Sequence, residues 1–200
     1  MAYAFSDVER ALAEIHVIAD ERRPAFVSRL QHLQKRRFPP GVNTGRGRAA
    51  SYFAEHAFLL GVALQMIEMS ITPERAIRII DSSLPALAGG AILAIEGSER
   101  IFCEVPTQTL MDLVYGDRAS EHVGLLTFDD NFADKKLYLM KEVDGPIRWS
   151  IFSLSGLITG LSQLLEGDHR ADFPDFLTGL LKWASGVGGV EKVWRGRDFG

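Results

Sequence analysis

The chain contains a single cysteine, Cys103, among its 200 residues. One thiol cannot form a disulfide framework within the chain, and it cannot make up a cysteine-based zinc site. Stable disulfides belong mainly to secreted proteins, whereas the cytoplasm keeps thiols reduced. The cysteine content therefore predicts a cytoplasmic protein in which Cys103 is a small buried hydrophobic residue.

Long hydrophobic runs are also missing. The longest apolar stretches, around 57–67, 84–95 and 151–165, are shorter than the ~20 residues that a membrane-spanning helix needs. The first ten residues lack the basic start and the apolar core of a signal peptide. We therefore expect a soluble protein without a membrane partner.

The sequence patterns of common catalytic and metal sites are absent too. Residues 43–48 lack the Gly-Lys-Ser/Thr ending of a phosphate-binding loop, and residues 152–156 lack the first glycine of a nucleophile elbow. The acidic residues 129–134 lack the glycine and the terminal glutamate of a calcium loop. The histidines do not have the spacing of a metal site. We therefore predict no enzyme activity, no metal and no cofactor.

Positive charge, by contrast, is concentrated between Arg22 and Tyr52. This stretch holds eight cations and no carboxylate, although the formal net charge of the chain is −4. The cations are Arg22, Arg23, Arg29, Lys35, Arg36, Arg37, Arg46 and Arg48. Such a local reversal of charge favours an anionic partner. The alternative is a charged surface that faces only solvent.

Charge also divides the chain into two parts. Residues 1–82 hold eleven Lys and Arg against nine Asp and Glu, whereas residues 83–200 hold eleven against seventeen. Pro85 and Gly89-Gly90 interrupt the helical pattern near the same point. We therefore predict a boundary near Ser82, with a basic domain at 1–82, an α+β domain at 83–185 and a flexible tail at 186–200.

The N-terminal part has the pattern of an all-helical domain with one hairpin. Apolar residues recur at helical spacing over 22–37, and Pro39-Pro40-Gly41 end that helix. Glycines and Asn43 then favour a short hairpin that carries two arginines. An apolar helix is expected from about residue 50 to 70. Thr72-Pro73-Glu74 is typical of the start of another helix.

The C-terminal part has mixed periodicity. Short β-prone runs predict strands at 91–95, 101–105, 122–128, 135–141 and 149–153. Helical patterns cover 107–115, 154–166 and 173–184. We therefore expect an α+β unit of about five strands and three helices.

The order of short sequence motifs in the N-terminal part resembles that of a known family. A basic helix ends in Phe38-Pro39-Pro40, a hairpin holds Gly45-Arg46-Gly47-Arg48, Tyr52 follows, and Ile71 to Ile77 closes the segment. This order resembles the winged helix-turn-helix domain of MerR-family proteins, a bacterial type of transcription regulator. The resemblance covers roughly residues 5–82, and it implies binding to double-stranded DNA.

The resemblance also implies roles for individual residues. The helix 22–37 would lie in the major groove, and the hairpin would form a wing on the flanking backbone. The expected base-reading residues are Arg22, Arg23, Ser28, Arg29 and His32. The expected phosphate contacts are Lys35, Arg36, Arg37, Arg46 and Arg48, with Asn43 in the turn of the wing and Tyr52 closing it.

Two family features are not matched. The family has a long dimerisation helix after the last helix pair, and Pro85 with Gly89-Gly90 argues against one here. The metal-sensing cysteines of the family are missing. We therefore expect a homodimer through the C-terminal domain, which would also sense a small-molecule effector or bind a protein partner.

The sequence thus favours a sequence-specific DNA-binding transcription regulator. The first alternative is a protein-interaction module, such as an antirepressor or adaptor, whose basic helix binds an acidic partner. The second is a small enzyme or ligand-binding protein built on the C-terminal half, for which the sequence offers no catalytic set.

Overall fold

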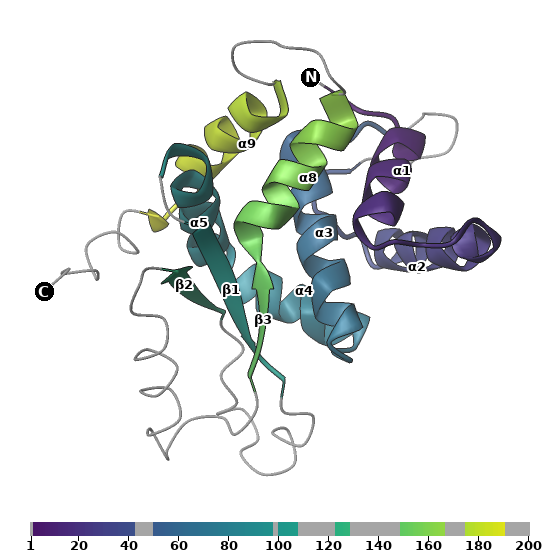
Figure 1. Cartoon of the computed structure of the whole chain (residues 1–200), viewed down its shortest axis with the longest axis horizontal. Helices are drawn as coiled ribbons and strands as arrows, with labels where there is room; N and C mark the ends of the chain where they lie inside the picture. Colours follow the sequence, from purple (N-terminus) through teal and green to yellow (C-terminus); the bar gives the residue numbers. More distant parts are fainter. Residues whose placement is uncertain are drawn as a thin grey trace, which may run out of the picture.

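The computed structural model describes residues 2–42, 50–97, 100–107, 123–128, 149–166 and 175–190. Within these residues the fold is a mostly helical α+β arrangement of seven α-helices and one three-stranded antiparallel sheet. Figure 1 shows the sheet at the lower side of the molecule and the helix α2 at its right edge. The predicted α+β class is confirmed at this level.

Two helices joined by a short turn open the chain. Helix α1 spans Phe5–Ile15, the 3-10 helix η1 spans Asp20–Arg22, and α2 spans Arg23–Lys35. The apolar residues of α2 at positions i, i+4 and i+7 are buried, so one face of α2 packs on the rest of the chain. The helix predicted over 22–37 is confirmed, with its ends one to two residues inside that range.

A Schellman motif ends α2. The Phe38 N–H donates to the Leu33 carbonyl at 3.1 Å, and the Arg37 N–H donates to the Gln34 carbonyl at 2.8 Å. Arg37 takes the left-handed position of this motif, with φ of 61°. Phe38 and Leu33 are both buried. The proline that follows cannot continue the helix, as the sequence predicts.

Helices α3 and α4 form the next pair. Helix α3 spans Ala54–Glu68 and is buried on most of its surface, and α4 spans Pro73–Ser82. The Arg75 N–H donates to the Thr72 hydroxyl at 3.3 Å, and Pro73 occupies the first turn. The predicted helix start at Thr72-Pro73 is therefore confirmed.

Helix α5, Leu84–Glu96, corrects the sequence prediction. Residues 91–95 are helical and not a strand, and the glycine pair does not break the helix. Pro85 lies in the first turn, where its missing N–H costs no helical hydrogen bond. A Cβ at Gly90 would come within 2.8 Å of Leu154 and 2.9 Å of Leu125. A side chain at this position would push the ends of Leu154 and Leu125 aside, so glycine allows the sheet and α8 to pack closely on α5.

The sheet has the order β2-β1-β3, with all neighbours antiparallel. Strand β1 spans Arg100–Pro106, β2 spans Gly124–Phe128 and β3 spans Trp149–Ser153. These strands confirm the predictions for 101–105, 122–128 and 149–153. The helix predicted at 107–115 and the strand predicted at 135–141 lie outside the described residues.

Two helices complete the described chain. Helix α8 spans Leu154–Glu166 and α9 spans Asp175–Gly186, so both predicted C-terminal helices are confirmed. Two serines where β3 meets α8 accept hydrogen bonds from backbone N–H groups, one in the first turn of α8 and one on β1. Ser153 Oγ accepts from the Gly156 N–H at 2.9 Å, and Ser155 Oγ accepts from the Ile101 N–H at 2.9 Å.

Elements from both sides of Ser82 share one hydrophobic core. Helix α1 packs on α8, and α3 contacts both α8 and α9. A Cβ at Gly61 of α3 would come within 2.8 Å of Leu157 of α8, so these helices approach closely. The boundary predicted at Ser82 stays a prediction. In the proposed tail, only residues up to Val190 are described.

None of the described helices is long and apolar enough by itself to cross a membrane. Only α4 and α5 taken together have the length and composition, and they form a bent pair with an angle of 76°.

Candidate nucleic-acid interface

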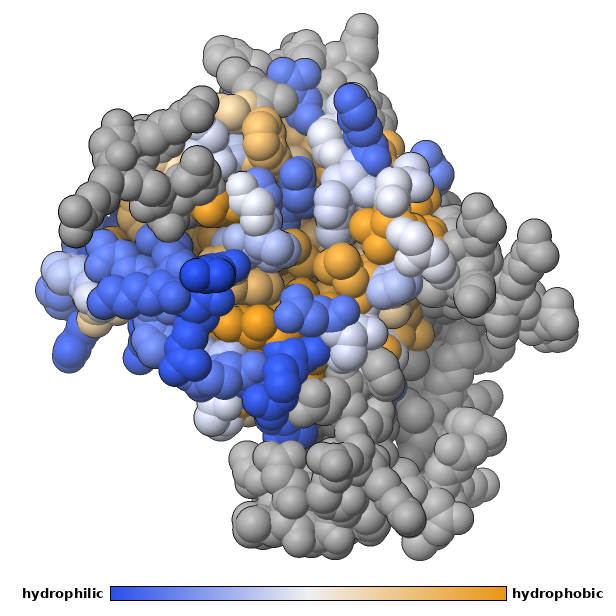
Figure 2. Space-filling view, turned by 180° about the vertical axis from the view of Figure 1, so that it is seen from behind, coloured by the Kyte–Doolittle hydropathy of each residue, from blue (hydrophilic) through white to orange (hydrophobic). Residues whose placement is uncertain are grey.

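Helix α2 has two chemically different faces. Phe26, Leu30 and Leu33 are buried against the core. Ser28 and Lys35 lie on the opposite face, seven residues apart, and both are exposed. Figure 2 shows hydrophilic surface gathered over the projecting region at the left of that view, where α2 lies. The helix therefore presents a polar, cationic face to solvent.

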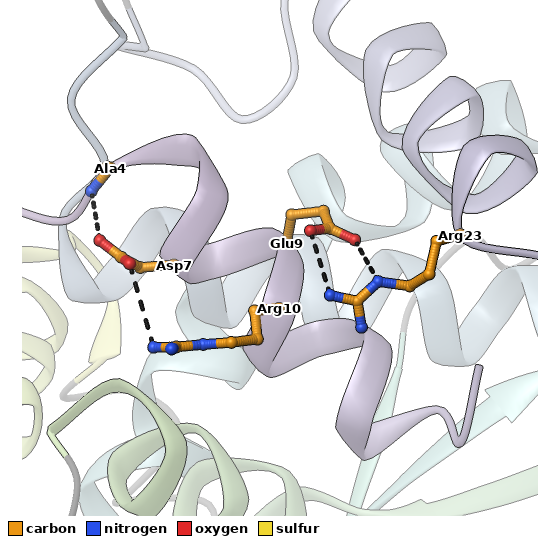
Figure 3. Close-up of polar contacts among 5 residues, drawn as sticks. All are labelled: Ala4, Asp7, Glu9, Arg10 and Arg23. Atoms are coloured by element: carbon orange, nitrogen blue, oxygen red, sulfur yellow. Dashed lines mark hydrogen bonds and ion pairs between the residues drawn. The ribbon is translucent and has the colours of Figure 1, made fainter. Parts of the chain in front are cut away.

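An ion pair holds the start of α2 on α1. Arg23 Nε lies 3.1 Å from Glu9 Oε1, and a second guanidinium nitrogen donates to Glu9 Oε2 at 3.4 Å. Figure 3 shows this fork, and it also shows Asp7 between the Ala4 N–H and Arg10. The side chain of Arg23 is 31% exposed and that of Glu9 only 13%. Arg23, predicted to read bases, therefore anchors α2.

A second carboxylate, on α4, contacts the end of α2. Glu74 Oε1 forms an ion pair with Arg36 and lies 3.6 Å from His32 Nε2. The pKa of Glu74 is lowered, mainly because its carboxylate accepts from its own backbone N–H at the start of α4. Arg36 and His32 lower it further. All three side chains keep more than a third of their surface exposed. This ion pair is therefore open to solvent and to any anion that approaches.

Four cations around α2 lack such a partner. Arg22, Arg29, Lys35 and Arg37 are exposed, and no ion pair involves them among the residues that the structure describes. Each guanidinium or ammonium group can therefore bind a phosphate without first leaving a protein carboxylate. Together with the two tethered arginines they make α2 and its ends strongly cationic.

Ser28 is the short polar side chain of this face. Its hydroxyl donates to the Pro24 carbonyl one turn earlier at 3.0 Å. The Ser28 oxygen keeps its acceptor capacity, and the residue is exposed. Ser28 therefore remains accessible at the centre of the outward face.

Tyr52 lies beneath α2 and not on its outward face. The Tyr52 side chain is fully buried, and its hydroxyl accepts a hydrogen bond from the Gln34 side chain of α2. The backbone of Tyr52 pairs with that of Tyr3 through N–H to carbonyl bonds of 2.7 and 3.0 Å. Tyr52 therefore joins the chain before α3 to α2 and to the N-terminus, and its side chain leaves no surface for a phosphate.

His56 is a residue of this region that the sequence patterns did not single out. Its Nδ1 accepts from the Phe53 N–H at 3.0 Å at the start of α3. The ring also hydrogen-bonds the Pro40 backbone, which has only a carbonyl to offer, so the other ring nitrogen carries the proton. Burial lowers the pKa of His56, although Glu55 opposes that shift.

The position of His56 relative to the start of α3 could have identified it as a helix-capping residue. A side chain three residues after the N-cap position commonly bonds back to the backbone N–H of the N-cap, as glutamate does in a capping box. His56 has this relation to Phe53. It therefore ties the two ends of segment 41–52 to each other, because Pro40 precedes that segment and Phe53 follows it.

The predicted wing lies outside the described residues. Asn43, Arg46 and Arg48 fall in segment 43–49, so the structure describes only the chain that enters and leaves it. The predicted contacts of these residues stay predictions.

Comparison with known proteins does not assign the chain to a family. No protein-family model matches the chain, and no curated protein is similar to it. The candidate interface therefore depends on its own contacts, burial and charges.

Proposed function

We propose that this chain is a sequence-specific DNA-binding transcription regulator. Its residues 1–82 would form a MerR-like winged helix-turn-helix domain, with α1 and α2 as the two helices and segment 43–49 as the wing. Residues 83–185 would form the smaller α+β domain. The proposal includes a cytoplasmic protein without catalytic activity.

The observation that carries this proposal is the cationic face of α2. Arg22, Arg29, Lys35 and Arg37 are exposed without an ion-pair partner among the described residues, while the other face of α2 is buried. Phosphate contacts of this kind supply most of the affinity of a protein for DNA through counterion release. A helix with one packed face and one cationic face has the form that major-groove binding requires.

Within this proposal the residues of α2 have three roles. Arg29, Ser28 and His32 are the base-reading candidates, because they lie along the exposed side of the helix. Lys35 and Arg37 bind phosphate near the end of the helix, and Arg22 does so near its start. Arg23 holds α2 on α1, so we assign it a positioning role.

The C-terminal domain would join two copies of the chain. In a homodimer, two copies of α2 would enter successive major grooves about 34 Å apart. The same domain would bind a small-molecule effector or a protein partner and thereby change the occupancy of the DNA site.

Selection from genomic DNA tests this proposal. The purified chain is incubated with genomic fragments at two salt concentrations, and the retained fragments are sequenced. The proposal predicts a few enriched fragments that share one site, with occupancy falling steeply as salt rises. Uniform, salt-sensitive retention would contradict sequence specificity. No retention at either salt concentration would contradict DNA binding and favour an acidic protein as the partner of α2.

A further inference from the structure

One carboxylate lies against the row of candidate DNA contacts on α2. Arg29, His32 and Arg36 are spaced at i, i+3 and i+7, so their side chains follow one side of the helix. Glu74 of α4 contacts two of these three residues, Arg36 through an ion pair and His32 at 3.6 Å. A negative charge therefore sits at the edge of the surface that the proposed function assigns to an anion.

The ion pair between Glu74 and Arg36 can be replaced by a contact of Arg36 with another anion. The Arg36 side chain is 47% exposed and that of Glu74 is 38% exposed. Ion pairs at such exposure contribute little to stability, because water and salt screen the charges. A phosphate could therefore replace Glu74 as the partner of Arg36. The pair between Arg23 and Glu9 differs, since Glu9 is only 13% exposed.

The neighbours of Arg36 make this exchange relevant to DNA. Lys35 precedes it and Arg37 follows it, and neither has an ion-pair partner among the described residues. All three cations lie at the C-terminal end of α2, so a phosphate backbone bound at this end would be within reach of their long side chains. Arg36 then has two possible anionic partners, the Glu74 carboxylate and a phosphate oxygen, and the carboxylate repels the phosphate.

We propose that Glu74 withholds Arg36 from DNA phosphate and thereby limits the affinity of this chain for DNA of any sequence. The inference deepens the proposed function and rests on it. Glu74 acts through Arg36 and does not touch the DNA. Its removal adds one phosphate contact to the complex, which makes binding both tighter and more sensitive to salt.

The variant Glu74→Gln tests this inference, because it removes the charge and keeps the size of the side chain. Its binding to a fluorescent duplex of random sequence is compared with that of the native chain between about 50 and 200 mM salt. We expect affinity to rise about two- to five-fold, the factor that corresponds to an exposed ion pair. The slope of log affinity against log salt should steepen by about 0.9.

Two further variants separate the exchange from a general effect of charge. Glu21→Gln removes one exposed carboxylate next to Arg22 in the sequence. Glu21 forms no ion pair with any described residue. It should leave the salt slope unchanged. Adding Arg36→Gln to Glu74→Gln should cancel the steeper slope. An unchanged slope in Glu74→Gln, or a steeper slope that survives the loss of Arg36, would overturn the inference.

A second readout keeps the inference separate from the proposed function. Heparin is a polyanion that is not DNA, so elution from a heparin column reports on free cations whatever the natural partner is. We expect Glu74→Gln to elute at higher salt than Glu21→Gln. Equal elution of the two variants would overturn the role of Glu74. Failure of the native chain to bind any duplex would instead overturn the proposed function alone.

Discussion

The side chain of Gln34 donates a hydrogen bond to the hydroxyl of Tyr52, and this bond joins α2 to the buried residue Tyr52 ahead of α3. Gln34 is half-buried on α2, whereas Tyr52 is fully buried and also pairs with Tyr3 through its backbone. The position of α2 therefore depends on a polar contact in the core as well as on its apolar face.

Loss of this hydrogen bond should weaken the fold. Tyr52→Phe leaves the half-buried Gln34 amide without its partner, so we expect the free energy of unfolding to fall by about 1 kcal/mol. Urea denaturation measures this change. In a double-mutant cycle with Gln34→Leu, the two losses should not add, because both variants remove the same bond. Additive losses would mean that the bond contributes nothing to stability.

The turn between α1 and η1 carries a strained residue. Val17 has φ of 51° in the left-handed region, and its side chain is 88% exposed. A β-branched residue is unfavourable in this conformation, and little packing offsets the cost. We expect Val17→Gly to raise the free energy of unfolding by about 0.5–1 kcal/mol. Val17→Ala keeps a Cβ, so its gain should be smaller. Equal stability of all three chains would contradict the strain.

His56 should make the stability of the fold depend on pH. Because burial lowers its pKa in the folded state, protonation favours the unfolded chain. The stabilisation is present above the ordinary pKa of about 6.5 and is lost as pH falls through the lower folded value. Urea denaturation from pH 8 to pH 5 should show a smaller loss for His56→Gln, whose amide keeps a donor and an acceptor. Parallel curves would contradict this role.

Glu104 of β1 should have the opposite pH dependence. The residue is 5% exposed, and burial raises the pKa of its carboxyl. The favourable contribution of the neutral form is therefore complete below the ordinary pKa and is lost as pH rises through the folded value. We expect Glu104→Gln to raise the free energy of unfolding at pH 7 by on the order of 1 kcal/mol. The gain should shrink at pH 4, and a gain independent of pH would contradict a charge effect.

The elements that the sequence predicted correctly are those with strong local signals. The apolar spacing of Phe26, Leu30 and Leu33 identified α2, and the cap and proline at Thr72-Pro73 located the start of α4. Helix α5 was missed because Gly89-Gly90 is locally unfavourable in a helix. There, packing of Leu154 and Leu125 against Gly90 outweighs local propensity.

The sequence predicted which residues make up the candidate site. It did not predict which of them form ion pairs. The sequence identified the cationic stretch, since charge is visible residue by residue. It could not reveal that Glu9 holds Arg23 or that Glu74 holds Arg36, because each pair joins residues far apart in the chain. These contacts distinguish Arg23, which is anchored by the poorly exposed Glu9, from Arg36, whose pair with Glu74 is open to solvent.

The central claim is that the cations in and around α2 that have no ion pair among the described residues bind DNA phosphate. The salt dependence of binding tests it most directly. Lys35→Gln with Arg37→Asn removes two of these cations, and asparagine tolerates the left-handed position of Arg37. The control Arg100→Gln with Lys182→Gln removes two exposed cations from β1 and α9. We predict that the first variant lowers affinity for every duplex and reduces the salt slope by about 1.8, whereas the control keeps the native slope. Identical slopes in the native chain and in both variants would contradict the claim.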